Sequence, residues 1–292
     1  MKNKLSTILV TGANGQLGSE LRVLSVSYPA YNFLFVTKEE LSIDNITAVK
    51  EYFNNHAIDY CINCAAYTAV DKAETEKEKA FQINADAVGY LAEACQLHNV
   101  QFIHVSTDYV FDGTATEPIK ENQHVNPLGV YGTSKLKGEQ QAISKNEETI
   151  IIRTSWVYSS FGNNFVKTML RLMKEKESIN VVSDQQGCPT YAADLAEAIM
   201  QIVIKNSASK TPGIYNYSNL GKINWYEFAV AIKELTSSKC LVNPIPTSQY
   251  PTPAKRPQYS VLDTSKIQQT FGIIIPEWKK SLKKCLSILV KS

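Results

Sequence analysis

Apolar runs with little polar alternation recur through the first half of the chain, and a helical pattern follows each of them. The runs cover residues 5–12, 31–37, 58–65, 101–108 and 149–155. Strands that lack a polar face are typical of parallel sheets that helices cover on both sides. The pattern therefore predicts a doubly wound, Rossmann-like α/β fold. Its longest helical stretch, residues 76–98, is expected to form one helix.

The pattern becomes less regular after Trp156. Helices are expected over residues 163–175, 192–205, 225–235 and 276–290, a strand over 213–218, and a loop over the proline-rich segment 243–257. We assign residues 1–155 to a dinucleotide-binding domain and residues 156–292 mainly to a smaller substrate-binding lobe. Segments around 178–220 are expected to complete the sheet of the first domain, so that the two parts interleave.

Composition and charge narrow the classes of function. Of the 292 residues, 44% are hydrophobic and 20% are charged, and the net charge is +2 without any block of like charges. This distribution is not that of a nucleic-acid-binding or membrane-binding protein, although a small anionic ligand needs only a few positive groups. No apolar run reaches the ~18 residues of a membrane span, and the N-terminal run is too short for a signal peptide. We therefore expect a cytoplasmic protein.

The six cysteines are scattered along the sequence. Cys61 and Cys64 form a lone C-x-x-C inside an expected buried strand, where residues three apart point to opposite faces. No second pair and no histidine cluster accompanies them. Buried structural thiols are therefore expected, and no metal or redox site is predicted.

A glycine-rich turn follows the first expected strand. Gly12, Gly15 and Gly18 are spaced G-x-x-G-x-x-G, which differs from the G-x-G-x-x-G fingerprint of dinucleotide-binding dehydrogenases. A plain strand–helix turn is the alternative. The position after strand one of a β-α-β series favours a phosphate-binding turn, where backbone N–H groups at a helix start hold a pyrophosphate. The predicted cofactor contacts here are Gly12, Asn14, Gly15, Gln16 and Leu17.

The end of the second expected strand lacks the usual acid. In many dinucleotide-binding folds a carboxylate at this point holds the adenosine ribose. Here Thr37 and Lys38 come first, and Glu39 and Glu40 follow. Lys38 either faces the 2′-phosphate of NADP or is a solvated loop lysine, and the sequence does not decide between the two.

Polar residues also follow the fourth expected strand. Ser106, Thr107 and Asp108 stand at its end, and strand carboxyl ends are where doubly wound sheets bind their ligands. The hydroxyl groups could donate hydrogen bonds to a carbonyl oxygen. Residues of these types also cap turns and helices, so a purely structural role is the alternative.

Tyr131 and Lys135 are four residues apart on an expected helix, and they therefore share one face. A free tyrosine has a pKa of ~10, which is high for proton transfer at neutral pH, and a neighbouring ammonium is expected to lower it. The lysine could also hold the nicotinamide ribose. A tyrosine and a lysine at this spacing occur often by chance. The pair becomes a specific signal here because the glycine turn and the Thr107 cluster precede it in the chain.

In combination, these stretches resemble the extended short-chain dehydrogenase/reductases, and within them the dTDP-4-dehydrorhamnose reductases. The resemblance runs nearly end to end and is carried by residues 11–18, 63–74, 106–113, 126–139, 153–170, 181–196 and 250–267. It implies that Thr107, Tyr131 and Lys135 are catalytic. It also implies that Ala65, Ala66 and Thr68 flank the cofactor and that Asp108 and Trp156 contact the sugar.

The implied reaction is reduction of the C4 keto group of dTDP-4-dehydro-L-rhamnose by NADPH or NADH, the last step of dTDP-L-rhamnose synthesis. A homodimer is also implied. Two alternatives remain open: a related sugar-nucleotide epimerase or reductase, which would keep the same triad, and a regulatory subunit that binds nucleotide without catalysis. Retained Tyr131 and Lys135 argue against the second alternative.

The chain departs from the family pattern at two places. Ser42 stands where members often carry an acid near the adenine, and Asp44 comes two residues later. Magnesium is implied for some members, but Ala192 and Ala193 precede Asp194 here, and the sequence offers no acidic cluster that could be assigned to the metal.

Overall fold

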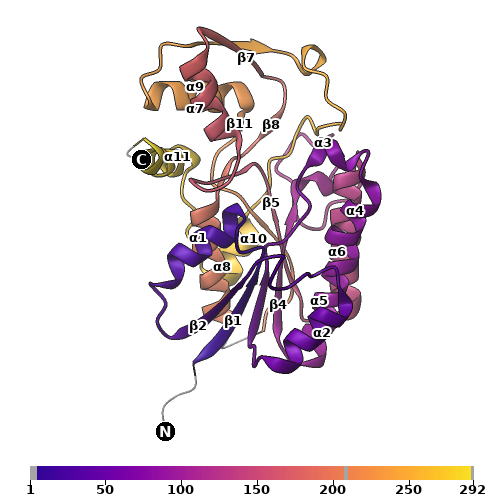
Figure 1. Ribbon diagram of the computed structural model, residues 1–292. Helices are drawn as coiled ribbons and strands as arrows, with labels where there is room; N and C mark the ends of the chain where they lie inside the picture. The colour runs from indigo at the N-terminus through magenta and orange to yellow at the C-terminus, as the bar shows by residue number, and fades with distance from the viewer. Residues whose placement is uncertain (1–4, 207–209, 291–292) are drawn as a thin grey trace.

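A parallel sheet of six strands lies at the centre of the molecule (Figure 1). The structure is a computed structural model that describes residues 5–206 and 210–290. The strands follow the order β10-β5-β4-β3-β1-β2, and all neighbours are parallel. Their bounds are Ser6–Thr11 (β1), Tyr31–Val36 (β2), Tyr60–Asn63 (β3), Gln101–Thr107 (β4), Ile150–Thr154 (β5) and Gly213–Tyr217 (β10). The predicted doubly wound fold is confirmed.

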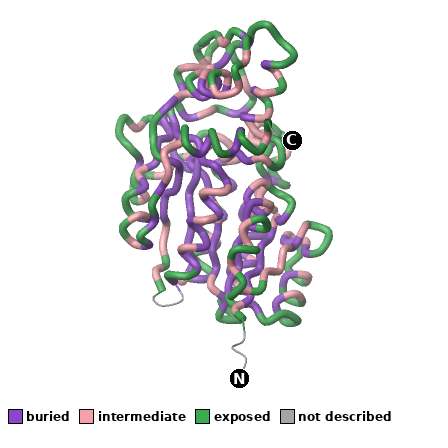
Figure 2. Tube along the Cα trace, turned by 90° about the vertical axis from the view of Figure 1, so that its left-hand side faces the viewer, coloured by how far each residue is buried: buried purple, intermediate pink, exposed green. Residues whose placement is uncertain are grey.

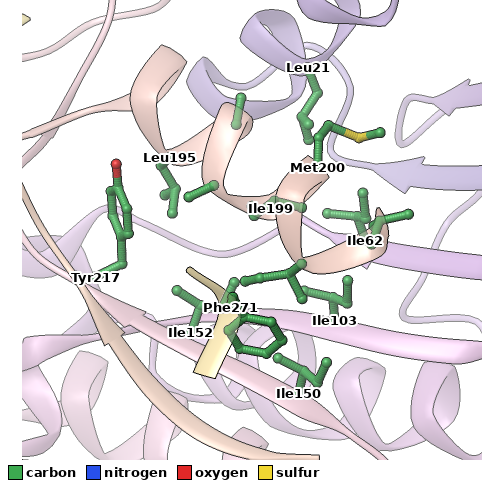
Figure 3. Close-up of a cluster of buried hydrophobic side chains, with 14 of the residues drawn as sticks. Leu21, Ile62, Ile103, Ile150, Ile152, Leu195, Ile199, Met200, Tyr217 and Phe271 are labelled. Atoms are coloured by element: carbon green, nitrogen blue, oxygen red, sulfur yellow. The ribbon is translucent and has the colours of Figure 1, made fainter. Parts of the chain in front are cut away.

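Helices cover both faces of the sheet and bury an apolar core on each. The first layer contains α1 (Gln16–Ser25), α8 (Ala192–Asn206) and α10 (Ser265–Phe271), and the second contains α2 (Ile46–Asn55), α5 (Ala87–Leu97) and α6 (Val130–Lys145). Successive strand residues point to opposite faces. Ile62 and Ile103 therefore meet the first layer (Figure 3), and their neighbours Cys61 and Phe102 meet the second. Figure 2 shows the strands as a buried layer between the helices.

The prediction of one continuous helix over residues 76–98 is wrong, because a π-helical turn interrupts it. The chain forms α4 (Lys77–Phe81), then the π-helical turn η1 (Gln82–Asp86), and then α5, after the short helix α3 (Val70–Ala73). The buried amide of Asn84 lies in η1, accepts from the backbone N–H of Tyr67 and donates to the Tyr67 carbonyl and to Ser134 Oγ. Single π turns inside α-helices are frequent at functional sites, and this one carries the amide that joins the loop after β3 to α6.

A smaller lobe stands above the carboxyl ends of the strands (Figure 1). Its apolar core is formed mainly by α7, α9, α11 and residues of three two-stranded sheets. The helices are Phe165–Glu175 (α7), Trp225–Leu235 (α9) and Trp278–Leu289 (α11). The strand pairs are Val157–Tyr158 (β6) with Thr190–Tyr191 (β9), Ser178–Val182 (β7) with Leu241–Ile245 (β12), and Gln186–Gly187 (β8) with Ile223–Asn224 (β11). The division of the chain into two interleaved domains stays a prediction.

The proline-rich segment is not wholly a loop. Residues 243–245 belong to β12, which pairs in parallel with β7, and η3 (Thr247–Gln249) follows. Pro244 is tolerated because β12 has a partner on one side only, so a missing N–H can face outward. Among the described residues, no helix is long and apolar enough to cross a membrane.

Candidate active site

A cavity of about 780 Å³ is lined by residues at the carboxyl ends of the strands and by residues 156, 157, 162 and 163. It brings together nearly all the predicted site residues, although they come from distant parts of the sequence. Its lining includes Gly12, Gly15, Gln16, Leu17, Lys38, Ala65, Ala66, Thr68, Thr107, Asp108, Tyr131, Lys135 and Trp156. Asn14 is exposed in the turn between β1 and α1 and is not part of this lining.

The glycine turn has the form of an anion cradle. Gly12 has a φ of +66°, and a Cβ there would lie 2.7 Å from the backbone nitrogen of Ala65. Glycine therefore lets the turn approach the loop after β3. Gly15 is the N-cap of α1 and provides no side-chain cap, so N–H groups of the first helical turn remain available to a ligand. A dinucleotide pyrophosphate fits this combination.

The part of the cavity next to the end of β2 is lined by a lysine and by a carboxylate. Lys38 is exposed and lines the cavity next to Thr37. The Glu40 carboxylate is turned back to accept from the Thr37 backbone N–H at 2.8 Å. Asp44 also lines the cavity and accepts from the Ser42 hydroxyl at 2.5 Å. A carboxylate is therefore present near this end of the cavity, two residues after the position where the family pattern places it.

Thr107 ends β4 and serves two purposes at once. Its Oγ1 accepts from the backbone N–H of Tyr109, which caps the short helix η2 (Asp108–Val110), and its hydroxyl donates to Asp108 Oδ1 at 3.0 Å. Thr107 and Asp108 both line the cavity. Asp108 is only 2% exposed, and burial raises its pKa to about 6. The capping role and a site role are therefore compatible.

Tyr131 lies in the first turn of α6, edge-on to Tyr109 with ring centroids 5.4 Å apart. Burial raises its pKa to about 12, and a hydrogen bond with Thr107 offsets this only in part. The expectation that Lys135 lowers the pKa of this phenol below its ordinary value is therefore wrong for this structure. A protonated phenol suits a group that must give a proton away.

Lys135 is 2% exposed, and burial lowers its pKa to about 8. Its Nζ donates to the backbone carbonyl of Val105 at 2.7 Å and lies 3.4 Å from His104 Nε2. The lysine and Tyr131 both line the cavity. The spacing of four residues on α6 therefore places both groups where a bound ligand can reach them.

Trp156 stands where the central sheet meets the lobe. It has a φ of +48°, unusual for a tryptophan, and its ring stacks on Trp225 with centroids 3.6 Å apart. A Cβ on Gly187 would lie 2.6 Å from the same ring, so a glycine is needed there for close packing. One part of Trp156 packs on the lobe core and another lines the cavity. The contact of this ring with a sugar stays a prediction.

Sequence patterns missed several residues that support the site. Asn84 holds the loop after β3 to α6, and Asn63 and His104 lie behind Lys135. A buried asparagine inside a helical pattern and polar residues in otherwise apolar strands were the available signals. Cys64, expected to be a buried structural thiol, is half-buried and lines the cavity. In the described part of the chain, no group of three or more His, Cys, Asp or Glu could hold a metal ion.

Comparisons with known proteins agree with this architecture. The family model described as RmlD substrate binding domain matches residues 6–290. The dTDP-4-dehydrorhamnose reductase of Aggregatibacter actinomycetemcomitans is 44% identical over 96% of this chain and 98% of its own length. That of Escherichia coli K12 is 38% identical, with 97% of each chain covered.

Solved structures show the same relation. The reductase from Clostridium acetobutylicum superposes with a TM-score of 0.92 at 42% identity, over 97% of this chain and 99% of the other. The reductase from Bacillus anthracis, in complex with NADP, has a TM-score of 0.93 at 37% identity, over 98% of this chain and 100% of the other. The chain therefore belongs to the RmlD family, and the four relatives described above are dTDP-4-dehydrorhamnose reductases.

Proposed function

We propose that this chain reduces the C4 keto group of dTDP-4-dehydro-L-rhamnose to give dTDP-L-rhamnose, with a reduced nicotinamide dinucleotide as the hydride source. The observation that carries the proposal is the convergence of Thr107, Tyr131 and Lys135 in one cavity with the glycine turn. A dinucleotide that starts on this turn extends along the strand ends toward the three residues. Family membership supplies the substrate class.

The cofactor, when bound, supplies the hydride that attacks C4. Gly12, Gly15 and the N-terminus of α1 hold its pyrophosphate, and Ala65, Ala66 and Thr68 flank it. Lys135, which lines the cavity, would hold the ribose next to the nicotinamide. These contacts orient the reacting groups, and orientation alone can contribute several powers of ten to a rate.

The side chains handle the proton. Tyr131 is protonated at neutral pH because burial raises its pKa, and it gives this proton to the O4 oxygen as the hydride arrives. The Thr107 hydroxyl turns from Asp108 toward the same oxygen and stabilises the charge that develops there. Asp108 and Trp156 fix the sugar between the sheet and the lobe.

The proposal is tested by mixing the purified protein with NADPH and dTDP-4-dehydro-L-rhamnose and following NADPH oxidation together with the sugar product. Stoichiometric formation of dTDP-L-rhamnose is expected. An epimerase would instead keep a tightly bound cofactor and consume none, and a regulatory subunit would bind the nucleotide without turnover. Either result would replace the proposed function. A cytoplasmic location and a homodimer, the latter testable by sedimentation, belong to the same proposal.

NADPH is expected to be used at least as well as NADH. No carboxylate stands at the first position after β2, and Lys38 is exposed where it can approach a 2′-phosphate. An exposed ion pair contributes only ~0.2–1 kcal/mol, so tolerance of both cofactors is predicted. The measurement is kcat/KM for each cofactor with wild type and Lys38→Ala. A preference for NADH of about tenfold, equal to ~1.4 kcal/mol, would contradict this prediction.

Trp156→Ala is expected to raise the KM for the sugar nucleotide and to lower kcat, because the ring lines the cavity and packs on the sugar. The stack on Trp225 is lost as well, so some loss of stability is expected. The Kd for NADPH should change little. Trp278→Ala is the matched control, since Trp278 packs in the same lobe core outside the cavity lining. If both variants raise the KM equally, Trp156 acts only through lobe packing.

Asp108→Asn is expected to stabilise the protein while weakening sugar binding. Burial raises the folded-state pKa to about 6 from an ordinary value near ~3.9, so the folded chain binds a proton between these pH values that the unfolded chain has lost. The free energy of unfolding therefore falls as pH rises through this window, by about 1–3 kcal/mol. Thermal unfolding above about pH 7 should show a higher Tm for the variant than for wild type. A lower Tm there would show that the carboxylate stabilises the fold.

A further inference from the structure

The π turn η1 contacts two parts of the cavity wall that lie far apart in the sequence. Its residue Ile83 lines the cavity and belongs to the apolar cluster around Tyr67, together with Val130 and Tyr131. The next residue, Asn84, is fully buried, and its amide bonds both to the loop after β3 and to α6. One turn therefore contributes an apolar wall residue and a buried polar group to the same region.

The Asn84 amide pairs with both backbone groups of Tyr67. Its Oδ1 accepts from the Tyr67 N–H at 2.9 Å, and its Nδ2 donates to the Tyr67 carbonyl at 3.0 Å. A backbone N–H can only donate and a carbonyl can only accept, so these two bonds fix which end of the amide is the oxygen. Tyr67 lies in the middle of residues 64–69, here called the cofactor loop, and its neighbours Ala66 and Thr68 line the cavity. Asn84 therefore holds this loop as a neighbouring strand would.

The same amide reaches the catalytic helix through Ser134. Its second N–H donates to Ser134 Oγ at 3.0 Å, and this hydroxyl donates its own proton to the backbone carbonyl of Tyr131 at 2.8 Å. Asn84 and Ser134 are both 0% exposed, and hydrogen bonds are stronger in such surroundings than in water. A continuous series of hydrogen bonds therefore runs from the backbone of Tyr67 to the backbone of the proton donor Tyr131.

Helix α6 also packs directly on the backbone of η1. A Cβ on Gly138 would collide with the backbone carbonyl oxygen of Asn84, so only glycine allows this approach. Backbone atoms on both sides of the contact cannot turn aside as a flexible side chain could. The hydrogen bonds and the close packing together therefore define one spacing between α6 and the cofactor loop.

We propose that Asn84 is a positioning residue that sets the distance between the nicotinamide and the Tyr131 phenol, because it holds the cofactor loop and α6 at one spacing. The inference rests on the proposed function, in which hydride and proton go to neighbouring atoms of one carbonyl group. The rate then depends on both distances at once. Loss of the Ser134 hydroxyl leaves the loop bonded to Asn84 and releases α6, whereas loss of the amide releases both. The two changes therefore differ in their expected effect on cofactor binding.

Ser134→Ala tests the link to the phenol alone. It is expected to lower kcat about tenfold, because small displacements of a catalytic group have effects of this order or larger. The Kd for NADPH should stay within about twofold of wild type, since Asn84 still holds Tyr67. Thr149→Val is the matched control, because it removes a buried hydroxyl that donates to backbone carbonyls at the other end of α6, outside the cavity lining. It should keep wild-type kcat. An unchanged kcat in Ser134→Ala, or an equal loss in both variants, would overturn the proposal.

A double variant shows whether this loss is due to the phenol. In Tyr131→Phe the phenol is absent, so the exact position of residue 131 no longer affects protonation. Ser134→Ala should therefore lower the residual kcat of Tyr131→Phe by less than about twofold, although it lowers wild-type kcat about tenfold. A second tenfold loss, equal in both backgrounds, would show that Ser134 acts on another step or on the fold, and the proposal would be overturned.

Asn84→Ala is expected to lower kcat by about 10²-fold and to raise the Kd for NADPH as well, because the cofactor loop and α6 both lose their shared partner. If this variant does not fold, Ser134→Ala and the double variant decide the proposal. A wild-type Kd in folded Asn84→Ala would overturn it, since the loop would then not depend on the amide.

The tie to the loop is also measured without any substrate, by hydrogen exchange at the backbone N–H of Tyr67. This N–H should exchange slowly in wild type and in Ser134→Ala, and much faster in Asn84→Ala. Equal exchange in wild type and Asn84→Ala would overturn the structural basis of the proposal. A wild-type protein that reduces no sugar would refute the proposed function and with it the kinetic part, whereas the exchange result would stand.

Discussion

Tyr131→Phe is expected to lower kcat for sugar reduction by about 10²–10⁴-fold, the range that general acid catalysis usually contributes. The change removes one oxygen from a side chain that already packs edge-on against Tyr109, so the ring contacts survive. The burial that raises the pKa of the phenol also keeps its proton in place until the hydride arrives. Steady-state rates with saturating NADPH and sugar give kcat, and quenching of NADPH fluorescence gives the cofactor Kd.

The Kd for NADPH should stay within about threefold of the wild-type value, a difference below ~1 kcal/mol. Tyr52→Phe is the matched control, since this tyrosine lies on α2 and not in the cavity lining. It should keep wild-type kcat. A Tyr131→Phe variant with near wild-type kcat would remove the phenol from the mechanism and leave another group to protonate O4.

Gly132→Ala is expected to lower kcat by about 10²-fold, because it changes the distance between Tyr131 and Thr107. A Cβ at position 132 would lie 2.2 Å from the backbone carbonyl oxygen of Tyr109. That oxygen belongs to η2, directly after Thr107, and it cannot turn aside as a side chain could. Helix α6 must then move away from the end of β4. A displacement of about 1 Å at a catalytic group can have an effect of this size.

Gly89→Ala is the control for this substitution. Gly89 is also a buried helical glycine, on α5, but a Cβ there would meet only the flexible side chain of Gln141 at 3.4 Å. It should keep wild-type kcat with a similar Tm. If Gly132→Ala keeps wild-type kcat, the close approach of α6 to η2 is not what positions Tyr131. If Gly132→Ala lowers the Tm but its folded fraction keeps wild-type kcat, Gly132 is needed for packing and not for the position of Tyr131.

The apolar runs predicted the central sheet because strands buried on both faces consist mostly of apolar residues. Ile8, Ile62 and Ile103 all lie in the core, as such a pattern requires. The glycine turn and the Tyr131–Lys135 pair were predictable for a similar reason, since local spacing determines which backbone turn or helix face they occupy. The cavity brings the predicted residues together, and their individual roles stay predictions.

Features that depend on contacts distant in sequence were not predictable from the sequence alone. The π turn at Asn84 forms because its amide bonds to Tyr67 and Ser134, which no helical periodicity reports. Pro244 is compatible with a strand because β12 pairs with β7 on one side only and therefore lies at the edge of its sheet. The raised pKa of Tyr131 results from burial within the folded structure. The Asn63–His104 pair requires the register of β3 and β4, which residue patterns do not contain.

The central claim, that the chain transfers a hydride to C4 of the sugar, is tested most directly with NADPH deuterated at the transferable position of the nicotinamide. The protein is incubated with this cofactor and dTDP-4-dehydro-L-rhamnose, and the product is analysed by NMR and mass spectrometry. The account predicts dTDP-L-rhamnose that carries one deuterium at C4 for each NADPH consumed, and almost none in Tyr131→Phe over the same time. Product without deuterium at C4, or consumption of no cofactor, would contradict it.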